Sequence, residues 1–275
     1  MSDSKSTPTE TSERFVGTLE VTKWATPIGR GIADAHHRLA SRIGPHPALA
    51  ASLVAGGALA VGASVLAARV YDSVADDNGI ERVDRPILHR AMRLRSAALD
   101  AAAAGIARVF GPVGMPILTL TVASLMAASR KSRTPVLLLG AAGAGSVAMT
   151  LAGKDLIKRH RPPHRDAIPP YEYSPSFPSG HTLNATTITG VVAYLLVLRQ
   201  KGTLPQAATV GAAIGTAATV GLSRVLLGAH WFTDVLVGWI TGSGWVALIL
   251  TSHRLYLTSR QRHEKEQGSK VAATP

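Results

Sequence analysis

Three short strings in the second half of the chain hold residue types that bind and transfer phosphate. The first is KDLIKRHRP at residues 154–162, in which Lys154 and Arg161 are seven residues apart. On a helix that spacing puts both cations on one face, two turns apart, and the following proline indicates that the helix ends at Arg161. Arginine binds phosphate through its planar fork and lysine as a point charge, so the pair suits a phosphate clamp. The alternative is a membrane anchor whose charged heads reach the lipid headgroups.

The second string, Pro178-Ser179-Gly180-His181, stands directly before an apolar run. Ser179 suits the N-cap of a helix, and Gly180 lets the backbone approach a ligand closely. The free N–H groups of a helix N-terminus favour an anion, and His181 can transfer a proton near neutral pH. The alternative is an ordinary capped helix start.

The third string is SRVLLGAHWFTD at residues 223–234. His230 and Asp234 are spaced by one helical turn, so the carboxylate can accept the proton of one ring nitrogen and leave the other as a nucleophile or base. Arg224 adds a third cation for the same anion. A His–Asp pair on one helix face is also a common structural hydrogen bond.

Long apolar segments must position these strings. About 20 apolar residues cross the hydrocarbon layer as a helix, and a buried helix of a soluble protein rarely has so many. Only 17% of the residues are charged, against about a quarter in soluble domains. The sequence therefore predicts an all-α, polytopic membrane protein with six transmembrane helices. The six predicted spans lie in windows without Asp, Glu, Lys or Arg: Ala48 to Ala68, Val109 to Ser129, Thr134 to Gly153, Thr182 to Leu198, Gly202 to Ser223 and Val235 to Ser252.

Basic residues in the short links predict the orientation. Residues 130–133 (RKSR) and 199–201 (RQK) are short and basic, which places them in the cytoplasm by the positive-inside rule. With six spans both termini are then cytoplasmic, and all three strings fall at outward-facing span ends. This predicts a cytoplasmic N-terminal tail at 1–46, a six-span domain at 47–252 and a basic cytoplasmic tail at 253–275.

Two segments outside the spans have helical patterns. Phe15 to Ile43 has the pattern of an amphipathic surface helix with basic side chains for anionic lipid, the alternative being a loose basic tail. Residues 86–108 alternate apolar and basic positions at helical spacing, which predicts a segment along the outer surface. His160 and His164, beside the first string, are interpreted as loop or interface residues. The histidines of the tails are the weakest functional candidates: His36, His37, His253 and His263.

Together the strings supply three cations, two histidines, a carboxylate and a helix N-terminus on one side of the membrane. Three cations around one site repel one another unless an anion of about two charges lies between them. The chain has no cysteine, and the strings offer no carboxylate pair for a metal ion, so no cofactor is expected. The pattern predicts phosphoryl transfer through a histidine.

The strings resemble, in order and spacing, the signature of the type 2 phosphatidic acid phosphatase (PAP2) superfamily. That signature is Lys, six residues, Arg-Pro; then Pro-Ser-Gly-His; then Ser-Arg, five residues, His, three residues, Asp, and every position is matched. The resemblance implies a PAP2-type six-helix bundle and a metal-independent phosphatase for membrane lipid phosphates. It implies that His230 attacks phosphorus, Asp234 orients His230, and His181 protonates the leaving group and then activates water. The residues that it implies for holding the phosphoryl oxygens are Lys154, Arg161, Ser179, Gly180 and Arg224.

The residues leave the lipid open. The Ala/Gly/Arg-rich composition indicates a high-GC bacterium, so a polyprenyl (undecaprenyl or decaprenyl) diphosphate at the inner membrane is the first candidate, before phosphatidic acid and phosphatidylglycerophosphate. A lipid phosphotransferase would use the same site. A transporter of phosphate-bearing lipids would also place basic residues in its path, although no inverted repeat is evident. Nucleic-acid binding is excluded, because the net charge of +12 is divided between tails and loops. The oligomeric state is not predicted.

Overall fold

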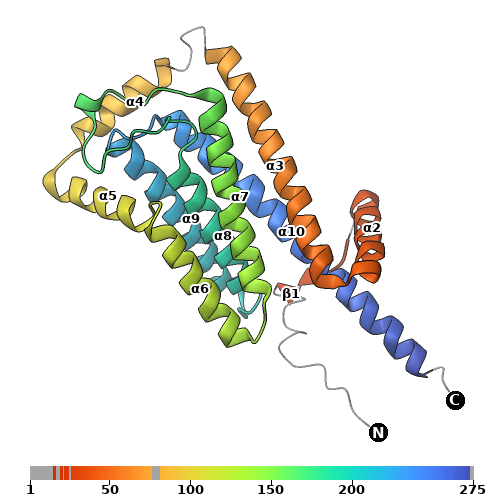
Figure 1. The fold of residues 1–275 in the computed structure, drawn as a ribbon. Coiled ribbons are helices and arrows are strands. Elements are labelled where there is room, and N and C mark those ends of the chain that lie inside the picture. Colours follow the sequence, from red (N-terminus) through yellow and green to blue (C-terminus); the bar gives the residue numbers. More distant parts are fainter. Residues whose placement is uncertain (1–14, 17–18, 21, 25, 76–80, 273–275) are drawn as a thin grey trace.

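The structure is a computed structural model that describes residues 15–16, 19–20, 22–24, 26–75 and 81–272 (Figure 1). Within these residues the chain is helical, apart from loops and one short antiparallel hairpin of β1 (Phe15–Val16) and β2 (Leu19–Glu20). The predicted all-α class is therefore confirmed. The helices are α2 (Pro27–Ile43), α3 (Pro45–Ala75), α4 (Glu81–Arg93), α5 (Ala97–Val109), α6 (Gly114–Arg130), α7 (Thr134–Ile157), the 3-10 turn η1 (His164–Asp166), α8 (Gly180–Val197), α9 (Thr203–Leu226) and α10 (Phe232–Ala272).

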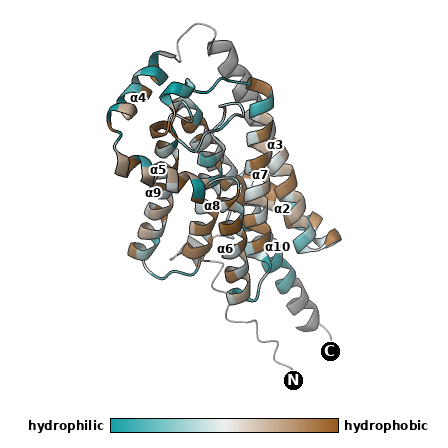
Figure 2. Ribbon diagram, turned by 60° about the vertical axis from the view of Figure 1, so that its left-hand side comes forward, coloured by the Kyte–Doolittle hydropathy of each residue, from teal (hydrophilic) through white to brown (hydrophobic). Residues whose placement is uncertain are grey.

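The predicted spans coincide with α3 and with the helices from α6 to α10. By length and composition, three of the described helices can cross a bilayer: α7, α9 and the first 34 residues of α10. A fourth candidate is the pair of α5 and α6, bent by 58° at a short break. The number of six spans stays a prediction. Figure 2 shows hydrophobic residues along the bundle, and many on its outside are exposed, as lipid contact requires.

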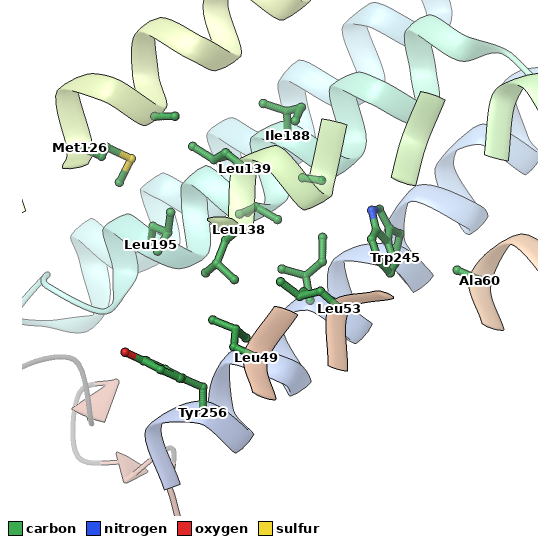
Figure 3. Close-up of a cluster of buried hydrophobic side chains, with 14 of the residues drawn as sticks. Leu49, Leu53, Ala60, Met126, Leu138, Leu139, Ile188, Leu195, Trp245 and Tyr256 are labelled. Carbon is green, nitrogen blue, oxygen red and sulfur yellow. The ribbon is translucent and has the colours of Figure 1, made fainter. Parts of the chain in front are cut away.

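Helix α8 lies at the centre of the bundle, packed against α7, α9 and α10. Figure 3 shows leucines of α3, α7 and α8 meeting Trp245 of α10 in the main buried cluster. Small residues bring these helices close together, as in other membrane bundles. A Cβ on Gly190 would lie 2.8 Å from Val246, and one on Gly242 would lie 2.9 Å from Thr186. The central position of α8 means that its N-terminus is surrounded by three other helices.

One end of the bundle holds α4, α5 and the loop of residues 158–179 between α7 and α8 (Figure 1); we name it the site end. The segment predicted at 86–108 consists of two helices, α4 and α5, separated by a break at residues 94–96. Arg95 in that break binds the carbonyl oxygens of Leu226 and Asp166, both at 2.8 Å. These bonds join the α4–α5 break to the end of α9 and to η1.

The opposite end carries the links of residues 131–133 and 198–202, together with α2. The helix predicted from Phe15 to Ile43 is correct only from Pro27, because the Thr26 side chain caps its N-terminus by accepting the N–H of Gly29 at 3.1 Å. Upstream of that cap, the chain forms the β1–β2 hairpin. Helix α10 (Phe232–Ala272) continues without a break past residue 252, the last residue of the predicted six-span domain, into the predicted tail.

Candidate active site

The three strings meet at the site end, but the first and the third adopt conformations that differ from those predicted from residue spacing. Helix α7 ends at Ile157, because Lys158 adopts a left-handed conformation (φ 50°) and its N–H bonds to the carbonyl of Lys154. The prediction that Lys154 and Arg161 share a helix face is therefore wrong. The chain instead folds back, and both cations bind Ser174: Lys154 Nζ donates to Oγ at 3.0 Å and Arg161 Nε to the carbonyl at 2.7 Å.

The predicted helix start at Ser179 is confirmed. Ser179 is the N-cap of α8, and its wholly buried hydroxyl accepts hydrogen bonds from the N–H (3.5 Å) and Oγ1 (2.9 Å) of Thr182. Its own N–H donates to the carbonyl of Asp234 at 3.2 Å. A Cβ on Gly180 would lie 3.0 Å from Thr150. In the structure Ser179 and Gly180 pack the N-terminus of α8 against α10 and α7. That these two residues bind phosphate stays a prediction.

His230 and Asp234 are also arranged differently from the expected pair on one helix. Gly228 (φ 66°) turns the chain after α9, and α10 begins only at Phe232, so His230 precedes the helix. Asp234 stands in the first turn of α10, where its carboxylate accepts the N–H of Trp231 at 3.0 Å, as in a capping box. The turn nevertheless brings His230 Nδ1 to 3.6 Å from Asp234 Oδ2.

The neighbours of each histidine decide which nitrogen faces the site. Arg161 Nη1 lies 3.1 Å from His230 Nε2. A guanidinium only donates, so Nε2 of His230 presents its lone pair and Nδ1 carries the proton toward Asp234. His181 Nε2 lies 3.1 Å from the carbonyl oxygen of Ala107, which only accepts, so that nitrogen carries a proton and Nδ1 faces the site. Both side chains are almost fully buried.

Glu172, which the sequence analysis did not single out, lies at the centre of the site. Its Oε2 is 2.8 Å from Arg161 Nη2 and 3.7 Å from His230 Nε2. Its Oε1 pairs closely with Arg224 and lies 3.5 Å from His181 Nδ1. Burial would raise the pKa of the Glu172 carboxyl, but the neighbouring His230 and the charge of Arg224 hold it well below its usual range.

A sequence signal for Glu172 existed. It is the only acidic residue between Asp166 and Asp234, so it alone can neutralise the basic residues of the α7–α8 loop from within that stretch. The neighbouring Tyr171 and Tyr173 are exposed, and His164 stacks on Tyr171 with ring centroids 4.4 Å apart.

Arg159 and Asp84, which the sequence analysis also did not single out, hold Asp234 in place. Arg159 donates to Asp234 Oδ1 at 2.6 Å and to Asp84 Oδ2 at 2.7 Å. Asp84, buried in α4, also accepts from Thr233 Oγ1 at 2.6 Å, and Ser176 donates to Asp234 Oδ2. No sequence signal marked Asp84, because its partners lie about 75 and 150 positions away.

The site opens on a cavity of about 370 Å³ lined by the α7–α8 loop and the turn before α10. Arg161 and Glu172 stand in its wall, beside Gly228 and Ala229. Among the described residues, no three His, Cys, Asp or Glu side chains gather as a ligand set for a metal ion. The arrangement offers an acceptor nitrogen on His230, a second histidine and two guanidiniums around one anion position.

The comparisons with known proteins agree with this geometry. The PAP2 superfamily profile matches residues 135–256, which include all three strings. Phosphatidylglycerophosphatase B of Bacillus subtilis (strain 168) is 31% identical over 179 residues, which cover 65% of this chain and 84% of that protein. The crystal structure of a transmembrane PAP2-type phosphatidylglycerolphosphate phosphatase from Bacillus subtilis is similar at a TM-score of 0.58 and 27% identity, covering 74% of this chain and 96% of that one.

These similarities extend over the bundle as well as over the three strings. The chain therefore belongs to the PAP2 superfamily and is a membrane phosphatase.

Proposed function

We propose that the protein hydrolyses the terminal phosphate of a membrane lipid through a phosphohistidine formed on His230. The observation that carries this proposal is the position of Glu172, whose carboxylate lies within 3.7 Å of both histidines and both guanidiniums. A phosphoryl group in that position would have a nucleophile, an acid and charged donors around it.

In the first step, Nε2 of His230 attacks phosphorus while the bond from phosphorus to the leaving oxygen breaks. His181, protonated on Nδ1, gives its proton to that oxygen. Arg161 and Arg224, with Lys154 beside them, bind the phosphoryl oxygens as charge builds on them. Asp234, held by Arg159 at 2.6 Å, accepts a hydrogen bond from the Nδ1–H of His230 and stabilises the imidazolium that forms.

In the second step, water attacks the phosphohistidine, and the bond between phosphorus and nitrogen breaks. Nδ1 of His181, now neutral, takes the proton of that water, and inorganic phosphate leaves. The separation of 3.6 Å between His230 Nδ1 and Asp234 is longer than a hydrogen bond. Such contacts commonly shorten when a substrate binds.

For the substrate we propose a phosphate monoester on a glycerophospholipid, with phosphatidylglycerophosphate first. The support is the similarity to phosphatidylglycerophosphatase B at 31% identity. This order differs from the composition argument, which favoured a polyprenyl diphosphate, and a direct comparison of the two lipids decides between them.

We also propose that the site end faces outward and both termini face the cytoplasm. The basic links Arg130–Arg133 and Arg199–Lys201 lie at the end of the bundle opposite to the site (Figure 1), which the positive-inside rule places in the cytoplasm.

The test measures phosphate release by the detergent-purified protein in EDTA, from phosphatidylglycerophosphate, phosphatidic acid and a polyprenyl diphosphate. We expect release by the wild type, abolished in His230→Ala, and acid-labile, alkali-stable phosphate on the protein when the reaction is quenched early. His89→Ala is the matched control, because His89 is an exposed histidine of α4. Normal turnover by His230→Ala would overturn the nucleophile, and no release from any lipid would favour the transferase or transporter alternatives.

A further inference from the structure

The carboxylate of Glu172 makes contacts that are normally made by a bound phosphate. Oε2 pairs with Arg161 at 2.8 Å and faces His230, and Oε1 pairs with Arg224 and faces His181. Each oxygen thus pairs with one of the two guanidiniums that the proposed function assigns to the phosphoryl oxygens, and each faces one of the two histidines. Glu172 is a side chain of the protein itself, so this anion is always present.

The carboxylate and a phosphoryl group cannot occupy the site together. Attack requires phosphorus within about 3–3.5 Å of the nucleophile, and Oε2 of Glu172 already lies 3.7 Å from Nε2 of His230. Arg224 is wholly buried, and a buried cation without an anion is strongly unfavourable. The guanidiniums are therefore neutralised by Glu172 before the substrate arrives and by phosphate afterwards.

The segment that carries Glu172 is built so that it can move away. Backbone hydrogen bonds flank it at Ile168 N–H to Leu227 (2.9 Å) and at Ser176 N–H to Arg159 (2.8 Å). Between them, no backbone–backbone bond joins residues 169–175 to another part of the chain that the structure describes.

The same cations hold this segment and face the anion. Lys154 and Arg161 donate to Ser174 and Pro175 in the segment. A phosphoryl group that binds these two cations therefore loosens the segment as it displaces the carboxylate. The cavity of about 370 Å³ beside Glu172 offers room for the displaced side chain.

We propose that Glu172 is the resident ligand of the phosphate site and selects terminal phosphates over phosphodiesters. This inference rests on the proposed phosphate site. To bind, the phosphate group of a lipid must displace the carboxylate of Glu172 and neutralise the two guanidiniums in its place. A terminal phosphate or diphosphate brings about two charges or more and can complete the exchange. An ordinary membrane phospholipid has a phosphodiester with one charge, which only equals the charge of Glu172, so it displaces the carboxylate less readily.

Binding of inorganic phosphate tests the displacement without turnover. In the inactive His230→Ala background, Glu172→Gln should tighten the Kd for phosphate about tenfold, as expected when the carboxylate occupies the donors about nine-tenths of the time. The measurement is the phosphate-dependent shift of the thermal unfolding midpoint. Asp166→Asn, which removes the same charge from the same loop, should leave the Kd unchanged. An unchanged or weaker Kd in Glu172→Gln would overturn the proposal.

Inhibition by a phosphodiester tests the selection. Short-chain phosphatidylglycerol should inhibit hydrolysis by Glu172→Gln at a concentration about tenfold lower than it inhibits the wild type, and Asp166→Asn should behave as the wild type. Equal inhibition of the wild type and Glu172→Gln would overturn the selection.

Glu172→Asp keeps the charge but has a shorter side chain, and it replaces Glu172→Gln if the glutamine variant does not fold. The Kd of Glu172→Asp for phosphate should then lie below that of the wild type. If the wild type hydrolyses no lipid but Glu172→Gln still binds phosphate more tightly, the proposed function is wrong, whereas the assignment of Glu172 as the resident ligand of the site is supported.

Discussion

The two ends of the bundle use the same residue types for different purposes. At the site end, His181 and His230 face a carboxylate on a loop that is open to a cavity. At the opposite end, His253 is fully buried between helices, where its Nδ1 lies 2.9 Å from the Tyr194 hydroxyl and its ring stacks on Tyr256. Both ends also bury an arginine, Arg224 in one and Arg130 in the other.

The difference lies in the partners and in what can replace them. Arg224 pairs with the side chain of Glu172, which an incoming anion can displace. Arg130 donates to the backbone carbonyl of Leu195 at 2.7 Å, which is fixed within α8 and cannot be exchanged without unfolding. A buried histidine or arginine is therefore a candidate for catalysis when its partner is mobile, and for structural support when its partner is a helix.

The largest expected contrast is between His230→Ala and His253→Ala. Loss of the proposed nucleophile should lower kcat by at least about 10⁴-fold, while the fold is retained. Loss of His253 leaves a cavity and removes its hydrogen bond with the Tyr194 hydroxyl, which lowers the free energy of unfolding by about 2–4 kcal/mol with kcat per folded molecule unchanged. Phosphate release and thermal unfolding of both variants measure this. A loss of kcat in folded His253→Ala would show that the two ends are not separable.

The second contrast is between two arginines with fixed partners, the half-buried Arg159 and the buried Arg130. Arg159→Met leaves Asp234 and Asp84 without their shared cation, so we expect a destabilisation of about 3–5 kcal/mol and a fall in kcat of about 10- to 100-fold, as when a group that orients a functional residue is removed. Arg130→Met should lower stability alone.

The double variant Arg159→Met/Asp84→Asn sharpens this test. Removing one anion with the cation should restore part of the stability but not kcat, because Asp234 still lacks its orienting partner. Full recovery of kcat in the double variant would contradict the role given to Arg159.

Spacing within a continuous segment predicted much of the fold. The charge-free windows coincide with six helices, and Ser179 caps α8 as its residue type suggested. The same reasoning failed where a single residue breaks a helix. Lys158 in a left-handed conformation ends α7 before Arg161, and Gly228 turns the chain before His230, so both pairs converge through loops.

Partners that are distant in sequence were not predictable from spacing. Glu172 meets Arg224 across 52 positions, and Asp84 meets Arg159 across 75. Which carboxylate neutralises which cation depends on how the helices pack, and a single sequence contains no measure of that. The one local signal that pointed to Glu172 is that no other acidic residue lies between Asp166 and Asp234.

The smallest expected effect concerns His36, which joins α2 to α10 at the opposite end. Its Nδ1 lies 2.8 Å from Ser259 Oγ, and burial lowers the pKa of its imidazole below the ordinary 6.5, although the backbone of Ala48 acts in the other direction. Beside it, the hydrogen bond from Arg262 holds the pKa of the Asp34 carboxyl below its usual range, so Asp34 stays ionised near that pH.

A histidine with a lowered pKa binds fewer protons in the folded chain than in the unfolded chain, so its contribution to stability is present above about pH 6.5 and is lost as the pH falls. Acidification from pH 7.5 to 5.5 should therefore lower the unfolding midpoint of the wild type more than that of His36→Gln, which cannot titrate. His89→Gln, which removes an exposed histidine, should follow the wild type. An equal drop in the wild type and His36→Gln would mean that α2 is held by the Asp34–Arg262 pair and by Trp24, which donates to Thr258 at 3.0 Å, rather than by neutral His36.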